Sequence, residues 1–146
     1  MNPHADSPAP GPSILVVEDD PDLAQLLQAF LAGRARVTCV SDGIAGVSAF
    51  REALANARPY DVVALDLDLP GMDGLRVLRA LRRAEREPWS GVRGRARIVM
   101  MTVHGNRDPV LQASAGGVDD FLVKPFTPDE LLRRLAPDWL AAAATG

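Results

Sequence analysis

Short apolar runs recur along the chain and alternate with segments whose apolar residues follow helical spacing. The runs lie at residues 14–17, 37–40, 62–65, 98–101 and 121–123. Such stretches, rich in valine and isoleucine, are typical of strands that are buried on both faces of a sheet. The alternation predicts an α/β fold, in which right-handed crossovers place helices on both faces of a five-stranded parallel sheet.

Helical spacing is clearest in four of the intervening segments. Its apolar positions are Leu23, Leu26, Leu27, Phe30 and Leu31 in the first segment, Val47, Phe50 and Leu54 in the second, Leu75, Leu78 and Leu81 in the third, and Leu131, Leu132 and Leu135 in the last. A short further helix is expected over roughly residues 108–115. Asp20 or Asp22 suits the cap of the first helix, because Pro21 favours a first helical turn.

The length of the chain bounds its domain organisation. Its 146 residues fit one domain, and a hydrophobic content of 47% is enough for a real core. Residues 1–12 are rich in proline and small polar residues, a composition that does not offset the entropy of ordering. We therefore expect a flexible leader over residues 1–12, a single domain over 13–136 and a tail over 137–146.

Charge and cysteine content exclude several classes of protein. The net charge of -3 gives no global attraction to nucleic acid or to an anionic membrane surface. Cys39 is the only cysteine, which excludes an internal disulfide framework, and its neighbours suggest a small buried side chain. No apolar run approaches the roughly 18 residues of a membrane span, and residues 1–12 show neither the basic region nor the apolar core that is typical of a signal segment. A cytoplasmic location is expected.

Arginines are concentrated in one part of the chain. Eight of the fifteen lie between Arg76 and Arg97, and five of these are expected on the outer face of the third helix: Arg76, Arg79, Arg82, Arg83 and Arg86. The connection over residues 87–97 is long and contains Trp89. One interpretation is a surface for nucleic acid or an acidic partner; the commoner one is a solvated basic face with Trp89 folded over apolar surface.

Acidic residues follow two of the predicted strands directly. Asp66 directly follows the run at residues 62–65, and Pro70 and Gly71 come soon after it. The run at 14–17 is followed by Glu18, Asp19 and Asp20. Asp66 either terminates the strand in an ordinary turn or faces a ligand crevice. Adjacent carboxylates repel one another unless a cation intervenes, and Mg²⁺ prefers such oxygen ligands. We interpret Asp20 as the helix cap and Glu18 with Asp19 as the candidate metal group.

Carboxyl ends of parallel strands share one edge of a sheet, so polar residues there are expected to converge. These residues are Glu18, Asp19, Asp66, Asp68, Thr102 and Lys124. Lys124 is the only lysine in the chain, which suggests that the position needs a compact ammonium. Carboxylates, one cation, one hydroxyl and an inferred Mg²⁺ suit phosphoryl transfer, with Asp66 as the nucleophile.

The pattern resembles the receiver domain of two-component response regulators from Ser13 to about Leu135. The resemblance lies in the pair Glu18-Asp19, in the sequence from Asp66 to Gly74, in Thr102 at the end of a strand, and in Val-Lys-Pro-Phe around Lys124. It implies a doubly wound, flavodoxin-like sheet in the order 2-1-3-4-5. It also implies a phosphorelay protein rather than an enzyme, with only self-catalysed formation and hydrolysis of an acyl phosphate on Asp66.

The family resemblance also implies roles for individual residues. A histidine kinase or phosphotransfer protein would supply the phosphoryl group to Asp66. Mg²⁺ would be held by Asp19, Asp66, the backbone carbonyl of Asp68 and waters, with Glu18 acting through water. Lys124 and Thr102 would each bind a phosphoryl oxygen.

The resemblance further implies a conformational switch. Thr102 would move inward, Phe121 would rotate into the vacated space, and the Lys124–Pro125 bond would be cis. The face around the fourth helix, fifth strand and last helix would then change its affinity for a downstream partner.

Three residues depart from the family pattern. Asp68 adds a carboxylate beside the acceptor, Val103 follows Thr102 where a small residue is usual, and Val118 likewise replaces a small residue. Because Asp68 repels incoming anions and Val103 narrows access, we expect both phosphorylation and hydrolysis to be slower than in a typical member.

Other interpretations fit less well. The pair Asp66 and Asp68 resembles the first motif of haloacid-dehalogenase-type phosphatases, but that family places its nucleophile strand first and its acidic pair last. A receiver that serves only as a binding module requires the loss of a key group, and none is missing. No DNA-binding or catalytic effector is expected in these residues, so the chain is either a stand-alone receiver or part of a longer regulator. Dimerisation through the last helix is a weaker expectation.

Overall fold

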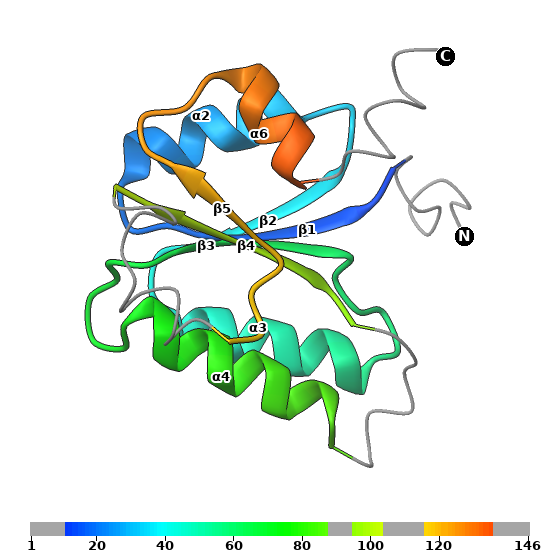
Figure 1. The fold of residues 1–146 in the computed structure, drawn as a ribbon. Helices are drawn as coiled ribbons and strands as arrows, with labels where there is room; N and C mark the ends of the chain where they lie inside the picture. The colour runs from blue at the N-terminus through cyan, green and yellow to red at the C-terminus, as the bar shows by residue number, and fades with distance from the viewer. Residues whose placement is uncertain (1–10, 88–94, 104–115, 136–146) are drawn as a thin grey trace, which may run out of the picture.

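The computed structural model describes residues 11–87, 95–103 and 116–135. These residues form β1 (Ser13–Val17), α2 (Pro21–Leu31), β2 (Arg36–Val40), α3 (Gly43–Ala55), β3 (Val62–Asp66), α4 (Gly74–Glu85), β4 (Arg97–Thr102), β5 (Asp120–Val123) and α6 (Pro128–Leu135) (Figure 1). All five predicted strands are present, and each end lies within one residue of the predicted apolar run. The expected leader, the tail, Trp89 and the short helix over 108–115 lie outside the described residues.

The strands form one parallel sheet in the order β2-β1-β3-β4-β5. This confirms the predicted doubly wound architecture. The register pairs Val17 with Leu65, and Asp66 with Met101. Neighbouring strands therefore end at nearly the same level, which places the residues that follow them at a common edge.

Helices cover both faces of the sheet. Helices α2 and α6 lie on one face and α3 and α4 on the other (Figure 1). Successive strand residues point to opposite faces, so Ile14 and Val16 pack in the core beneath α2 and α6, whereas Leu15 and Val17 pack with residues of α3 and α4. This double burial explains why β1, β3 and β4 are apolar without alternation. The edge strands β2 and β5 are only partly buried, because each has a neighbouring strand on one side alone.

Aspartates cap α2, α3 and α4, the helices that follow β1, β2 and β3. The Asp20 carboxylate accepts hydrogen bonds from the backbone N–H groups of Asp22 and Leu23 at 3.0 and 3.5 Å, which confirms Asp20 as the cap of α2. Asp42 and Asp73 cap α3 and α4 in the same way. Each connection on this edge is thereby fixed close to the strand that it follows.

One apolar position of α2 is open to solvent, and the prediction for one arginine of α4 was wrong. Leu26 is 62% exposed, because the buried stripe of α2 is carried by Leu27 and Leu31 instead. Arg82 was expected on the outer face of α4, yet it is 8% exposed. It lies one turn beyond Leu78, on the buried side of the helix. Arg82 donates hydrogen bonds to the carbonyl oxygens of Ala96 and Gly117 and to the carboxylates of Glu85 and Asp119, each at 2.8 Å.

The remaining structural expectations concern Cys39 and the membrane. Cys39 is half-buried rather than fully buried, and burial raises the pKa of its thiol. Among the described helices, none has the length and apolar character needed to cross a bilayer.

Candidate functional site

Polar side chains gather where four strands end. Glu18 and Asp19 follow β1, Asp66 ends β3, Thr102 ends β4 and Lys124 follows β5. Each of these strands is parallel to its neighbours and in the register described above. Residues separated by more than 100 positions in the sequence are thereby brought to one edge, as the alternation of strands and helices predicts.

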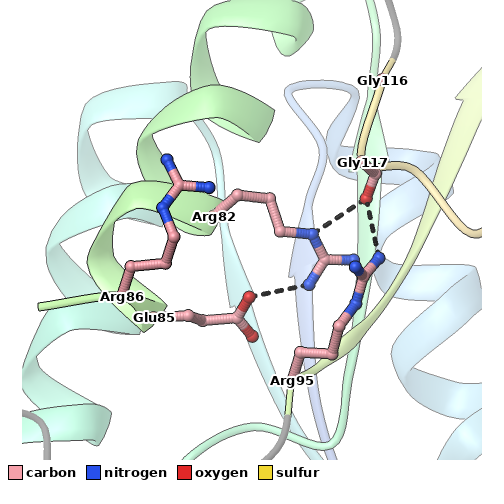
Figure 2. Close-up of a pocket in the computed structure, with 6 residues that line it drawn as sticks. All are labelled: Arg82, Glu85, Arg86, Arg95, Gly116 and Gly117. Carbon is pink, nitrogen blue, oxygen red and sulfur yellow. Dashed lines mark hydrogen bonds and ion pairs between the residues drawn. The ribbon is translucent and has the colours of Figure 1, made fainter.

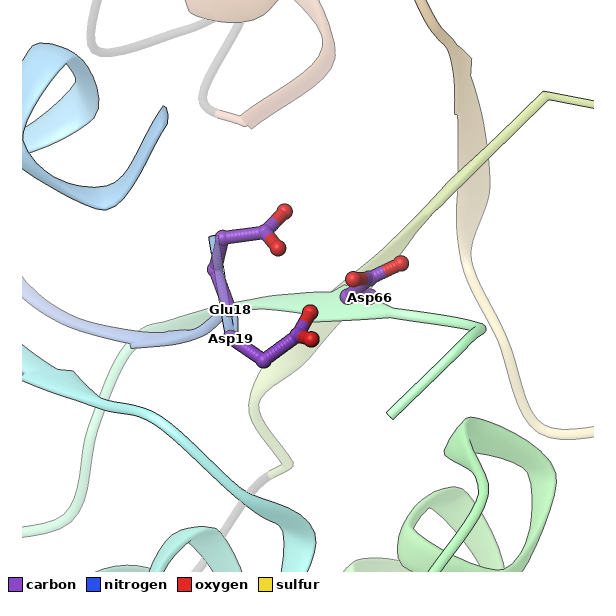
Figure 3. A group of neighbouring side chains, drawn as sticks. All are labelled: Glu18, Asp19 and Asp66. Carbon is purple, nitrogen blue, oxygen red and sulfur yellow. The ribbon is translucent and has the colours of Figure 1, made fainter. Parts of the chain in front are cut away.

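Three carboxylates form a tight group at this edge. Glu18, Asp19 and Asp66 each offer one carboxylate oxygen, and these oxygens all lie within 4.8 Å of one another (Figure 3). Glu18 and Asp66 are only 2% and 3% exposed, whereas Asp19 is open to solvent. Like charges at this separation, partly out of water, repel strongly, so the group favours binding of a cation.

Lys124 supplies one positive charge to the group. Its Nζ lies 3.0 Å from Glu18 Oε1 and 3.2 Å from Asp66 Oδ1. Its backbone N–H donates to the carbonyl oxygen of Thr102 at 2.8 Å, which ties the two residues together. One ammonium against three carboxylates leaves the group with an excess of negative charge.

The loop after β3 holds Asp66 in place. The backbone N–H of Asp68 donates to Asp66 Oδ1 at 3.1 Å. Gly74 N–H donates to the carbonyl oxygen of Leu67 at 2.8 Å, and a Cβ at Gly74 would lie 2.5 Å from the Asp66 carbonyl oxygen. Only glycine therefore allows α4 to begin this close to the strand end.

Thr102 and Phe121 occupy the neighbouring strands β4 and β5. Thr102 is 1% exposed and pairs with Val123, while Phe121 is partly buried and packs against the core under α3 and α4. Val103, the next residue after Thr102, is 59% exposed. The Lys124–Pro125 peptide bond is cis, as the family resemblance implies.

Burial and charge both alter the acidity of the group. Burial, opposed by the Asp20 N–H and reinforced by the nearby Asp66 carboxylate, raises the pKa of Glu18 to about 7. Burial alone would lower the pKa of Lys124, but its hydrogen bond with Glu18 and the charge of Asp66 outweigh this effect and raise it. Lys124 is therefore held as an ammonium, and a bound cation would favour the ionised form of Glu18.

The donor set fits a divalent metal that prefers oxygen. Two buried carboxylates and one that is open to solvent match the way Mg²⁺ binds in proteins, where it keeps several waters. The side chain of Asp68 is exposed and is not among the three carboxylates of this group.

Sequence reasoning identified the side chains that meet here but missed Gly74. The requirement for glycine at that position depends on how closely the helix approaches Asp66, which is a tertiary contact. Its sequence signals are its place directly after the capping residue Asp73 and its position at the end of the motif that begins at Asp66, and neither reveals the close contact.

Comparisons with known proteins agree with this geometry. A sequence model described as "Response regulator receiver domain" matches residues 14–136. The transcriptional activator protein PfeR of Pseudomonas aeruginosa is 36% identical over 96% of this chain and 44% of its own length. The DNA-binding response regulator MtrA of Mycolicibacterium smegmatis is 42% identical over 84% of this chain and 48% of its own length. The chain thus spans less than half of these relatives.

A solved structure extends the likeness to three dimensions. The receiver domain of the sensor histidine kinase PA1611 from Pseudomonas aeruginosa, with a magnesium ion coordinated in its active-site cleft, superimposes with a TM-score of 0.68 and 32% identity. The likeness covers 90% of this chain and 98% of that one. These matches give no support to the alternative of a haloacid-dehalogenase-type phosphatase. The chain belongs to the response regulator receiver domain family of two-component signalling.

Proposed function

We propose that Asp66 accepts a phosphoryl group from a phosphohistidine of a sensor histidine kinase or a phosphotransfer protein. The observation that carries the proposal is the position of Asp66: it is 3% exposed, belongs to a group of three carboxylates within 4.8 Å, and lies 3.2 Å from Lys124 Nζ. A carboxylate held rigidly at a strand end, beside a cation, is suited to in-line attack on phosphorus.

Mg²⁺ is the proposed cofactor. Asp19, Asp66 and the backbone carbonyl of Asp68 would hold it, with Glu18 acting through water. When bound, the ion neutralises charge on the phosphoryl oxygens and lowers repulsion between them and the carboxylates. A magnesium ion in the cleft of the related PA1611 receiver supports this assignment.

The proposed transfer forms one bond and breaks one. An Asp66 carboxylate oxygen attacks phosphorus, the phosphorus–nitrogen bond to the donor histidine breaks, and the released imidazole takes up a proton. Lys124 and Thr102 each donate a hydrogen bond to an oxygen of the acyl phosphate on Asp66. Hydrolysis by water later regenerates the carboxylate, so the chain turns over only its own phosphoryl group.

Phosphorylation is proposed to be read by Thr102 and Phe121. Thr102 would move toward the new phosphoryl oxygen, and Phe121 would rotate into the space that it leaves. Phe121 lies on β5 and Thr102 ends the neighbouring strand β4. A downstream partner, an effector domain or a second copy of the chain would bind at the face that includes β5 and α6. We propose that this domain, over residues 13–136 and in the cytoplasm, makes no direct contact with nucleic acid.

Intact mass spectrometry after incubation with acetyl phosphate and Mg²⁺ tests the proposal. The wild-type chain is expected to gain the mass of one phosphoryl group, and Asp66→Asn is expected to gain none. Asp42→Asn, which changes a capping carboxylate of α3, serves as the matched control and should be labelled like the wild type. A folded wild-type chain that stays unlabelled, or equal labelling of Asp66→Asn, would overturn the assignment.

A further inference from the structure

Three arginines form a row on the outer face of α4. Arg76, Arg79 and Arg83 are exposed and follow the i, i+3, i+7 spacing of one helix face, and we call them the arginine stripe. Together with Met72 and Ala80 they line a hollow of about 280 Å³. The stripe is about 10 Å long at the rise of an α-helix.

The stripe is not neutralised within the part of the chain that the structure describes. The only acid of α4, Glu85, bonds the buried Arg82 instead, at 2.8 Å (Figure 2). Arg82 also pairs with Asp119, and Arg95 pairs with the same carboxylate. No ion pair among the described residues includes a member of the stripe.

The stripe contrasts with the charge of the rest of the molecule. The chain carries a net charge of -3, and the carboxylates of Asp66, Asp68 and Asp73 lie just before the amino end of the same helix. A long polyanion such as duplex nucleic acid would extend beyond the stripe and meet these carboxylates. The short basic surface therefore suits a short acidic ligand.

The chemistry of the hollow narrows the ligand further. Guanidinium groups bind carboxylates through two parallel hydrogen bonds. Met72 and Ala80 add apolar surface to the lining of the hollow, which a bare phosphodiester chain would not use. An amphipathic helix with carboxylates one turn apart and an apolar residue between them complements both features.

We propose that the arginine stripe of α4 binds an acidic, amphipathic segment of another protein. This binding does not require phosphorylation of Asp66. The stripe lies on the outer face of α4, and none of its arginines belongs to the cluster of Glu18, Asp19 and Asp66. The site is separate from the face of β5 and α6 on which the switch is proposed to act.

Fluorescence anisotropy with a labelled peptide of about 16 residues, built from glutamate, alanine and leucine in helical spacing, tests this proposal on the full chain. In low salt, the triple variant Arg76→Gln, Arg79→Gln, Arg83→Gln is expected to bind about tenfold to hundredfold more weakly than the wild type. The matched control Arg34→Gln, Arg36→Gln, Arg58→Gln makes the same change in net charge elsewhere on the surface and should bind like the wild type.

Three results would overturn the proposal. The first is no binding of the peptide by the wild type, and the second is equal weakening in the stripe variant and in the control variant. The third is tighter binding of a short DNA duplex than of the peptide, with loss of that binding in the stripe variant, which would make nucleic acid the ligand. Circular dichroism of both triple variants checks that they keep the wild-type fold.

Discussion

Lys124 reaches from the end of β5 to the end of β1, where its Nζ lies 3.0 Å from Glu18 Oε1. The same atom lies 3.2 Å from Asp66 Oδ1, so one ammonium joins carboxylates from two other strands. Glu18 and Asp66 are nearly completely buried, so water does little to screen the negative charge of either carboxylate. The contact therefore both stabilises the edge of the sheet and presents a cation to the proposed phosphoryl group.

Replacement of Lys124 by methionine is expected to destabilise the metal-free protein by about 1–3 kcal/mol, because buried carboxylates lose their partner. The same change should slow labelling by acetyl phosphate by roughly tenfold or more, since a charge-assisted hydrogen bond is lost. Urea denaturation and the time course of intact mass measure the two effects. Stability and labelling both equal to the wild type would show that Lys124 has no such role.

Metal-free protein is expected to become more stable, relative to Glu18→Gln, as the pH falls from about 8 to 5. The pKa of Glu18 is raised from 4.5 to about 7, so the folded state takes up a proton over a range in which the unfolded chain does not. The gain is at most about 3 kcal/mol. Mg²⁺ should abolish this trend, because it favours the ionised carboxyl group.

Denaturation of both proteins at several pH values, with and without Mg²⁺, provides the measurement. Taking the difference between wild type and Glu18→Gln removes the titration of the other carboxylates. A difference that stays constant from pH 8 to 5 would mean that Glu18 is ionised throughout.

Asp68→Asn is expected to speed both labelling and hydrolysis. A negative charge close to the acceptor in watery surroundings costs an incoming anion up to about 1 kcal/mol, which is up to about fivefold in rate. The expected change in rate is this small because the side chain of Asp68 is exposed to solvent, which screens its charge. Val103→Ala should act in the same direction by widening access beside Thr102. Quenched time courses of phosphorylation and of decay after removal of acetyl phosphate measure both rates, and unchanged rates in both variants would refute the expected slow chemistry.

Gly74→Ala is expected to lower both stability and labelling. The added Cβ would lie 2.5 Å from the carbonyl oxygen of Asp66, so α4 or the strand end must shift, at a cost of about 1–3 kcal/mol. Gly116→Ala is the matched control, because a Cβ there meets nothing within 4 Å. In thermal unfolding and in acetyl phosphate labelling, Gly74→Ala should lie below the wild type and Gly116→Ala should match it. Identical behaviour of the two variants would show that Gly74 is not needed to position Asp66.

The alternation of apolar runs and helical segments predicts the parallel sheet, and the runs stop abruptly at Glu18 and Asp66, which marks two strand ends in the sequence. Parallel strands bring such ends to one edge of the sheet, but the strand order, which makes β1 and β3 neighbours, came from the resemblance to receiver domains. Arg82 could not be placed in this way. Its burial depends on partners far along the chain, such as Gly117 and Asp119, that accept its hydrogen bonds. The exposure of Leu26 could not be foreseen for a related reason, since the choice of buried residues in α2 depends on what the helix packs against.

The most direct test is to identify the labelled aspartate. Borohydride reduction of the acetyl phosphate-treated chain, followed by peptide mass spectrometry, converts an acyl-phosphorylated aspartate to homoserine and marks its position. We expect the conversion at Asp66 alone, and only when Mg²⁺ was present during labelling. Conversion at Asp19 or Asp68, or at Asp66 to the same extent without Mg²⁺, would contradict the account.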